Sequence, residues 1–285
     1  MPEYGPEMSA VLDGLRDMPS LPVVMAKLVG IIARPETSAS DIAGVLSRDP
    51  GLVTRILKQV NSSYYGFPRR IATITSAVVI LGFRQILNIA MSSLVFNNFV
   101  AGARAGLDIN GLWLHSLGAA FLSSAIARRV APRNAEDAFI CGLLHDLGKF
   151  VMFRNDADNA VRVNELAVRD GILSLEAERR LLPYDHAGLG AAALERWNLP
   201  PAIVDIVRFH HDPLAAPAEA VLPACVANFA DLAARALLMG KCGDQGIGVL
   251  TAEVWARIGL DWPAVEEISR QVAEEYVKSG AFFGA

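Results

Sequence analysis

Cysteine is scarce in this sequence, which has 285 residues and three cysteines, Cys141, Cys225 and Cys242. No two of them form a C-x-x-C pair. An odd number of scattered thiols argues against a disulfide framework and is typical of a reducing cytoplasm, where thiols are buried as small hydrophobic groups. We therefore predict a cytoplasmic protein with buried, unpaired thiols.

A strong net charge and an apolar leader are also missing. The net charge of −4 at pH 7 argues against a strong binder of nucleic acid or of anionic membranes. Residues 1–20 carry acidic side chains such as Glu7 and Asp13 and no apolar core, so no signal peptide is visible. Two stretches lack charge, Gln85–Ala103 and Gly111–Ala127. Because they contain polar and small residues, we interpret them as buried helices and predict no membrane association.

Signals of β-structure are absent as well. The chain shows no convincing alternation of apolar and polar residues, no repeat of fixed length and no low-complexity tract. It is 53% hydrophobic, rich in Ala and Leu, and only 7% aromatic. This composition predicts an all-α protein with an extensive core.

Helix boundaries can be predicted from capping residues. After a short acidic leader to about Asp17, a first helix should end at Pro35. Ser38 and Asp49 should cap the next two helices, and Gly82 should separate two more. Asn134, Asp185 and Asp261 are further expected caps. In the second half we predict helices at about 110–130, 135–153, 155–169, 174–181, 185–196, 201–211, 218–238, 251–258 and 263–279, with an exposed loop at 243–248.

The small and polar stretch AGARAGLD suggests a domain boundary near residues 104–110. We predict an N-terminal bundle of about five helices in residues 1–105, packed on a second helical domain in residues 106–285. The expected helices at 41–47 and 50–60 resemble a helix-turn-helix, although any all-α domain contains such pairs. Arg48, Arg55 and Lys58 form no dense basic face, so we do not favour DNA binding.

The stretch from Asn134 to Arg154 carries the most informative residues. Apolar side chains recur there with a period of 3.6 residues, which predicts one buried helix with Ile140, Leu143, Leu144, Leu147 and Val151 in the core. His145 and Asp146 interrupt this apolar surface. Because burying both without partners costs several kcal/mol, a divalent metal is a natural partner for the pair.

Histidine is confined to the second part of the chain, and the five residues are His115, His145, His186, His210 and His211. A single histidine beside apolar residues is usually a core or surface residue, and one at a helix C-terminus also complements the helix dipole. Four predicted helices each carry histidine beside an apolar face, however. We expect the histidines to gather in one pocket, with Fe²⁺, Mn²⁺ or Zn²⁺ as the metals that suit them.

The order of these histidines resembles the HD superfamily of helical metal-dependent phosphohydrolases. The successive steps from His115 to His145, from His145 to His186 and from His186 to His210 are 30, 41 and 24 residues. They are similar to those of the HD-GYP branch, whose enzymes hydrolyse cyclic di-GMP. In that family a lysine matching Lys149 contacts phosphate.

The N-terminal half is similar to the HDOD domain, the HD-related output domain of bacterial signalling. The similar segments are MPSLPVV, SRDPGLVTRILKQVNSSYYG and ITSAVVILGFRQI, followed by WLHSLGAA, CGLLHDLGK, HAGLGAAALERWNLP and FHHDP. They extend from about Met18 to Leu237. The resemblance implies a regulatory protein that partners receiver, kinase or diguanylate-cyclase modules.

The resemblance also implies a set of site residues. The metal ligands would be His115, His145, Asp146, His186, His210, His211 and Asn228. Asn228 stands where a terminal Asp in a V-A-D context is expected, with Asp231 about one turn further on. Gly111 replaces a glutamate of trinuclear sites, and no Gly-Tyr-Pro loop follows Asp212. These departures predict a degenerate site with fewer anionic oxygen donors, which would weaken a metal-bound hydroxide.

Two functions follow from these residues. The first is a non-catalytic signalling protein that acts through protein–protein contacts. The second is a metal-dependent phosphohydrolase of a nucleotide or of cyclic di-GMP, with Asp146 and Lys149 as its catalytic residues. The loss of anionic ligands favours the first, and the complete set of histidines supports the second.

Overall fold

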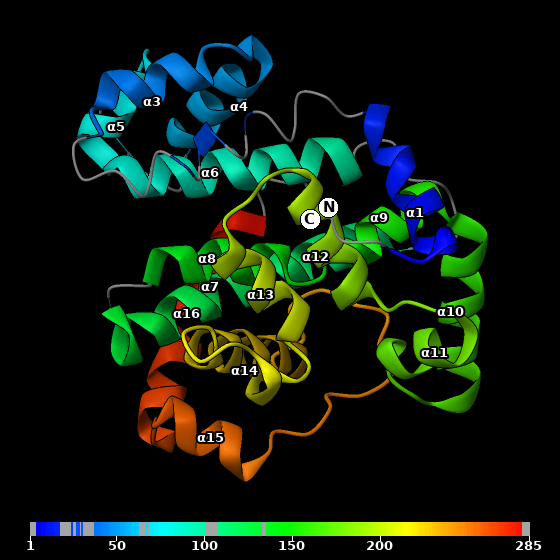
Figure 1. Cartoon of the computed structure of the whole chain (residues 1–285). Helices are drawn as coiled ribbons and strands as arrows, with labels where there is room; N and C mark the ends of the chain where they lie inside the picture. The colour runs from blue at the N-terminus through cyan, green and yellow to red at the C-terminus, as the bar shows by residue number, and fades with distance from the viewer. Residues whose placement is uncertain are drawn as a thin grey trace.

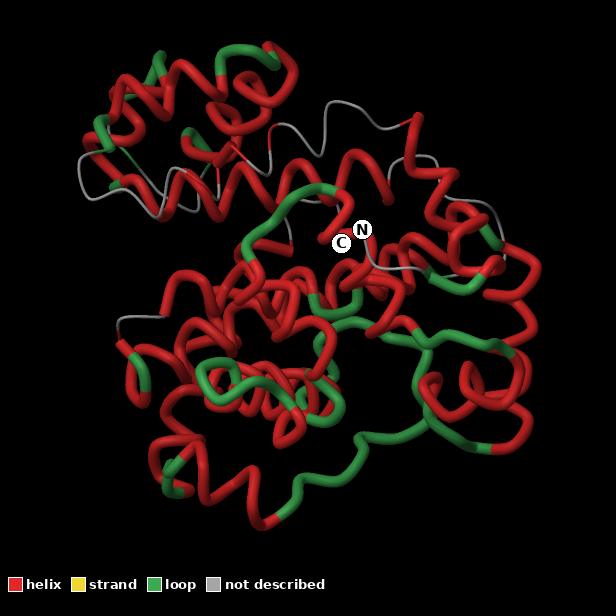
Figure 2. The backbone as a smooth tube through the Cα atoms, viewed as in Figure 1, coloured by secondary structure: helices red, strands yellow, loops and turns green. Residues whose placement is uncertain are grey.

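The computed structural model describes residues 4–17, 24, 27, 28, 30, 37–62, 67, 69–100, 108–132 and 135–280. All regular structure in these ranges is helical, and no strand occurs in them (Figure 2). This confirms the predicted all-α class. The expected cap at Asn134 and most of the expected helix before Pro35 lie outside the described residues.

Four helices of the N-terminal half lie together at one end of the molecule (Figure 1). They are α3 (Ala39–Leu46), α4 (Pro50–Val60), α5 (Ile74–Leu81) and α6 (Phe83–Val95), and a π-helical turn, Phe96–Val100, continues α6. The predicted caps are confirmed: Ser38 forms a capping box with Asp41, and Asp49 accepts a 2.9 Å hydrogen bond from the Leu52 amide. Local sequence therefore determines where these helices begin.

The second half is built around α7 (Ile109–Val130), which packs against α8, α14 and α16. The other helices are α8 (Ala135–Leu144), α9 (Leu147–Asn155), α10 (Ala157–Asp170), α11 (Ser174–Leu181), α12 (His186–Arg196), α13 (Pro201–Phe209), α14 (Val221–Ala236), α15 (Ala252–Ile258) and α16 (Trp262–Gly280). Among the described helices, α7 is long and apolar enough to cross a membrane, but 78% of its apolar window is buried inside the protein. Such burial is typical of a core helix.

The predicted core is confirmed. Ile140, Leu143, Leu144, Leu147 and Val151 are all buried, and Trp113 and Leu117 of α7 are buried beside them. One cluster of buried side chains extends from Leu46 and Ile86 of the N-terminal helices to Leu144 and Leu189. The two halves therefore share a core. The expected boundary falls largely on residues 101–107, outside the described ranges, and the division into two domains stays a prediction.

The single helix predicted for 135–153 is wrong, because the structure contains two helices separated by a turn at His145 and Asp146. The His145 ring binds the Gly142 carbonyl at 2.7 Å and so satisfies one of the free carbonyls in the last turn of α8. The apolar side chains on both sides of the turn still face the core. The spacing of the apolar residues therefore continues across the turn at His145 and Asp146, so this spacing alone could not predict the turn.

The acidic leader is also more ordered than expected. It contains α1 (Pro6–Asp13) and a 3₁₀ turn, Gly14–Asp17. Helix α1 packs against α9 and α12 of the second half, and Leu12 is fully buried there. The Asn155 side chain donates a 2.9 Å hydrogen bond to the Val11 carbonyl. This helix precedes α3–α6 in the chain but binds the other half.

Candidate metal centre

Four segments bring the predicted histidines together. His115 lies on α7, His145 and Asp146 form the α8–α9 turn, His186 begins α12, and His210 and His211 follow α13. Helices α9 and α12 approach closely because Gly148 faces backbone: a Cβ added there would lie 2.0 Å from the His186 carbonyl oxygen. Gly148 therefore allows α12 to place its first residue beside the α8–α9 turn.

Asp146 lies at the middle of the cluster and is completely buried. One carboxylate oxygen, Oδ1, is 3.2 Å from His186 Nε2. The other, Oδ2, is 3.4 Å from His145 Nε2 and 3.8 Å from His115 Nε2. A single carboxylate thus faces imidazoles from three segments.

The second carboxylate of the cluster comes from Asp231 on α14. Its Oδ1 lies 3.0 Å from His115 Nε2 and 3.7 Å from His145 Nε2. Asn228 points elsewhere, since its amide nitrogen donates a 2.8 Å hydrogen bond to the His210 carbonyl. Asp231 therefore supplies a second carboxylate beside the imidazoles, whereas the assignment of Asn228 as a metal ligand stays a prediction. Phe229-Ala230-Asp231 offers the same apolar-Ala-Asp context, which was the available signal.

Arg235 holds Asp231 in place. Its guanidinium binds both oxygens of the Asp231 carboxylate, with the longer of the two hydrogen bonds at 2.9 Å. Two parallel hydrogen bonds of this kind fix the plane of the carboxylate as well as its position. Arg235 therefore orients one wall of the cluster from the next turn of α14.

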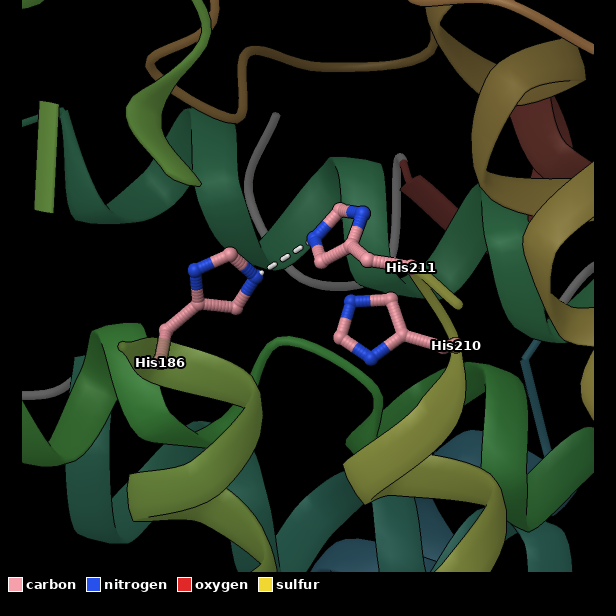
Figure 3. A group of neighbouring side chains, drawn as sticks. All are labelled: His186, His210 and His211. Atoms are coloured by element: carbon pink, nitrogen blue, oxygen red, sulfur yellow. Dashed lines mark hydrogen bonds between the residues drawn. The ribbon is translucent and has the colours of Figure 1, made fainter. Parts of the chain in front are cut away.

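A second group consists of His186, His210 and His211 (Figure 3). His186 Nε2 and His211 Nε2 are 2.8 Å apart, and the rings of His210 and His211 have centroids 4.0 Å apart. On its other side, His186 Nδ1 is 2.7 Å from Glu178, which also accepts a hydrogen bond from the His186 amide. His210 Nδ1 is 2.7 Å from the Val207 carbonyl. Outer partners of this type orient metal-binding imidazoles in other proteins.

Several atoms of the cluster lack hydrogen-bond partners. Within the described residues, the buried atoms without one include Nε2 of His115, His145 and His210 and Oδ1 of Asp146. Two sets have ligand atoms within 4.8 Å of one another: His115, His145 and Asp146 form one, and His186, His210 and His211 the other. Buried polar atoms without partners are costly. Imidazole nitrogens and a carboxylate facing one another fit Fe²⁺, Mn²⁺ or Zn²⁺.

Burial and neighbouring charges set the protonation states. Burial lowers the pKa of His115, although Asp231 partly offsets this, and burial with nearby histidines lowers the pKa of His210 to about 3. Burial also lowers the pKa of His211. For His145 burial acts in the same direction, but Asp146 and Asp231 outweigh it and raise the pKa to about 10. Burial thus favours the neutral, metal-binding form of His115, His210 and His211, whereas the two carboxylates favour the cationic form of His145.

The carboxylates remain ionised. Burial alone would raise the pKa of Asp146, but Lys149 and His145 hold it well below the usual value. Burial would likewise raise the pKa of Asp231, but Arg235 and His115 hold it well below that value. Both groups are therefore available as anionic ligands.

Lys149 is buried and surrounded by acceptors. Its ammonium group donates to Asp146 at 3.0 Å, to the Cys242 carbonyl at 3.2 Å and to Asp244 at 3.4 Å. The loop 243–248 was predicted to be exposed, and residues 245–248 are, but the Asp244 side chain is only 2% exposed. Sequence patterns gave no signal for Asp244, because its partners belong to distant segments.

A cavity of about 500 Å³ lies beside the cluster. Its lining includes His115, Arg235 and Asp108, together with Lys241, Asp244 and Ile247 of the loop between α14 and α15. This volume is within the usual range for small-molecule sites in proteins. The cavity therefore borders the cluster at His115.

Comparisons with known proteins agree with this architecture. The model of the HDOD domain matches residues 18–213, and the chain belongs to the HDOD domain family. A Treponema pallidum (strain Nichols) protein described as an "Uncharacterized protein" is 30% identical over 217 residues, which cover 74% of this chain and 41% of that protein. The chain spans about two-fifths of the length of this curated relative.

Two solved structures share the fold. An HDOD domain protein of unknown function from Geobacter sulfurreducens is 25% identical, with a TM-score of 0.81 and 92% of each chain covered. A protein of Shewanella amazonensis SB2B, provisionally described as a phosphohydrolase, is 23% identical, with a TM-score of 0.71. The match covers 96% of this chain and 98% of that one. The second likeness establishes the fold alone.

Proposed function

We propose that this chain is a bacterial signal-transduction protein that works in the cytoplasm through protein–protein contacts and does not turn over a substrate. Its histidine cluster serves as a structural or ligand-sensing centre. The partners suited to this role are receiver, kinase or diguanylate-cyclase modules. The observation that carries the proposal is the enclosure of Lys149, the residue assigned to phosphate by resemblance.

The contacts of Lys149 leave it no open side toward a substrate. Asp146, Asp244 and the Cys242 carbonyl accept its hydrogen bonds, and the side chain is 3% exposed. Asp146 and four of the five histidines are also at most 1% exposed. A phosphohydrolase must place phosphorus beside both a nucleophile and a cation that neutralises its oxygens. In this arrangement the cation is already neutralised by the protein.

A metal-dependent phosphohydrolase acting on a nucleotide or cyclic di-GMP remains the second candidate. The specific observation in its favour is Asp231, which gives the cluster a second carboxylate beside Asp146. A divalent metal, when bound, would activate water for attack. His115, His145, Asp146 and Asp231 would hold one metal, and His186, His210 and His211 would hold another. Lys149 would bind phosphate only after leaving Asp244.

One pair of measurements separates the two functions. The full chain is purified, reconstituted with Fe²⁺, Mn²⁺ or Zn²⁺, and its metal content is determined by elemental analysis. The same samples are assayed for hydrolysis of cyclic di-GMP and of an activated phosphodiester, with Asp146→Asn as the matched control. We expect no turnover above that of Asp146→Asn, whatever the metal content. Turnover that Asp146→Asn abolishes would establish the enzyme and reject the proposal.

A further inference from the structure

Charge is divided unevenly between the two ends of the molecule. Residues 37–105 contain seven Lys and Arg side chains and two acidic ones, whereas residues 106–285 contain 16 and 23. Six of the seven cations belong to α3–α6 or to their connections, and these helices lie together at one end of the molecule (Figure 1). One chain therefore combines a basic end with an acidic body.

The two acidic side chains of the basic end already have partners within it. Asp41 completes the capping box with Ser38, and Asp49 caps α4 and lies 4.0 Å from Arg55. Four further cations are exposed and form no ion pair with an acidic residue of the described ranges, namely Arg48, Lys58, Arg69 and Arg70. Their charge is therefore open to a partner.

Two hydrogen bonds hold Arg70 beside the end of α4. The Asn61 side chain accepts a 2.7 Å hydrogen bond from the Ile71 amide and donates one of 2.8 Å to the Ile71 carbonyl. Arg70 directly precedes Ile71, and Lys58 lies about one turn before Asn61 on α4. Both cations therefore belong to the same end of that helix, and the fold places them there without ion pairs.

Helix α5 adds exposed apolar surface to the basic end. Val79 is 74% exposed and Ile80 is 52% exposed, although Ala77 and Val78 of the same helix are buried. Exposed apolar side chains that are grouped beside charged ones mark sites of protein–protein contact. We call this surface the basic face and define it by Lys58, Arg69, Arg70, Val79 and Ile80. Pairing it with the same face of another copy would bring like charges together, so its complement is acidic.

Helix α16 carries a surface of opposite charge. Residues 261–280 contain five acidic side chains and two basic ones. Trp262, Glu266, Glu274 and Val277 are exposed, Trp262 by 65% and Val277 by 69%, and their spacing places them on one side of the helix. Among the described side chains Arg270 is the single cation on that side, and the two glutamates outnumber it. We call these four exposed residues the acidic face.

Trp262 is held in position for a contact of this kind. Its ring stacks on Trp255 of α15, with centroids 5.3 Å apart and planes at 27°, and Trp255 lies edge-on to Phe229 of α14 at 5.6 Å. A tryptophan that is already ordered loses little side-chain freedom on binding, and tryptophan is enriched among the residues that dominate interfaces. The exposed side of the Trp262 ring is therefore suited to anchor a partner.

The basic and acidic faces cannot meet within one molecule. Trp262 lies against α15, and α15 and α3–α5 are at opposite ends of the molecule (Figure 1). We propose that the basic face of one copy docks on the acidic face of a second copy, apolar side chains against apolar ones and cations against glutamates. Such a head-to-tail contact closes into a pair when each copy uses both faces, and otherwise extends to larger assemblies. It involves none of the histidines, so it stands or falls independently of metal content and hydrolysis.

The test uses the full chain alone, because the partner is a second copy. Sedimentation velocity over a range of protein concentrations measures association at about 50 mM and about 500 mM sodium chloride. Arg70→Glu reverses one charge of the basic face, and Glu266→Lys reverses one charge of the acidic face. The matched controls are Arg162→Glu and Glu165→Lys, which reverse exposed charges on α10. Val79→Ser tests the apolar part of the contact.

We expect the wild type to associate, and the higher salt concentration to weaken association at least about tenfold through screening. Arg70→Glu and Glu266→Lys should each weaken it at least about tenfold, since each places like charges opposite one another. An equimolar mixture of these two variants should associate again, because one unaltered face of each kind is then present. Val79→Ser should weaken association without changing its dependence on salt, and both controls should behave like the wild type.

Three results would overturn the proposal. The first is a wild type that stays monomeric at the lower salt concentration, including one that binds a DNA duplex instead, which would assign the basic face to nucleic acid. The second is association that does not respond to salt, and this measurement on the wild type decides even if a variant does not fold. The third is loss of association in Arg70→Glu but not in Glu266→Lys, or no recovery in their mixture, since either would exclude the acidic face as the partner.

Discussion

His115 Nε2 lies 3.0 Å from Asp231 Oδ1, and this contact joins α7 to α14 at the edge of the histidine cluster. Both side chains are at most 1% exposed. Arg235, one turn further along α14, donates two hydrogen bonds to the same carboxylate. The packing of α14 on α7 therefore decides which oxygen faces the imidazoles.

Replacing Asp231 by Asn should weaken metal binding. The change removes the negative charge nearest to His115 and leaves Asp244 as an ionic partner of Arg235. We expect the affinity for Mn²⁺ or Zn²⁺ to fall at least about tenfold, since even the loss of an outer partner has that effect. Competition with a coloured chelator measures the change.

Asn228→Asp is the informative comparison for this prediction. One oxygen of its carboxylate would take the place of the amide nitrogen and face the His210 carbonyl, acceptor against acceptor. We therefore expect it not to raise the metal content. A higher metal content in Asn228→Asp, together with an unchanged metal affinity in Asp231→Asn, would show that position 228, and not Asp231, provides the ligand.

Leu144→Ala should destabilise the protein by about 2–5 kcal/mol, because Leu144 is fully buried next to the α8–α9 turn and its removal leaves a cavity. Urea unfolding at neutral pH measures the loss. Leu214→Ala is the control: Leu214 is 43% exposed, and we expect a change within about 0.5 kcal/mol. Similar small effects at both positions would refute the assigned face of α8.

The stability that Asp244 provides should depend on pH. Burial acts to raise its pKa, but Lys149 and Arg235 hold it below the ordinary value of 3.8. A lowered pKa in the folded state means that the ionised carboxylate stabilises the fold above the unfolded pKa, and that this contribution disappears as pH falls through the folded pKa. Asp244→Asn should therefore be less stable than the wild type at pH 7.

This difference in unfolding free energy should stay constant down to about pH 5 and shrink below about pH 4, since the wild type then loses the charge that the variant lacks. Urea unfolding at several pH values follows it, and Gln245→Ala should track the wild type throughout. A difference that is the same at pH 7 and pH 3.5 would contradict the ionised state of Asp244.

Helix starts were predictable because capping is local. Asp185 accepts a 2.9 Å hydrogen bond from the Gly188 amide, and Asp261 accepts one from the Ala264 amide, as their positions before apolar runs indicated. The break at His145 was not predictable, because it depends on a side chain turning back to a carbonyl while the apolar period continues.

Helix α14 shows a different limit of prediction from sequence. Asn228 and Asp231 lie three positions apart on one helix, so both are near α7 in any register. Only the rotation of α14 about its axis decides which one reaches the imidazoles. Asp244 lies further beyond sequence reasoning, since Lys149, Arg235 and Ser174 come from three different helices and no local pattern links them.

The attachment of helix α1 determines which part of the molecule a force on the N-terminal end of the chain would reach. It comes first in the chain but is fastened to the half that carries the histidines, by Leu12, by the Asn155–Val11 hydrogen bond and by a 2.9 Å ion pair between Asp13 and Arg196. Arg196 is the last residue of α12, and His186 is the first. A force applied to the chain before α1 would therefore act on α12, whose first residue is His186, without passing through α3–α6.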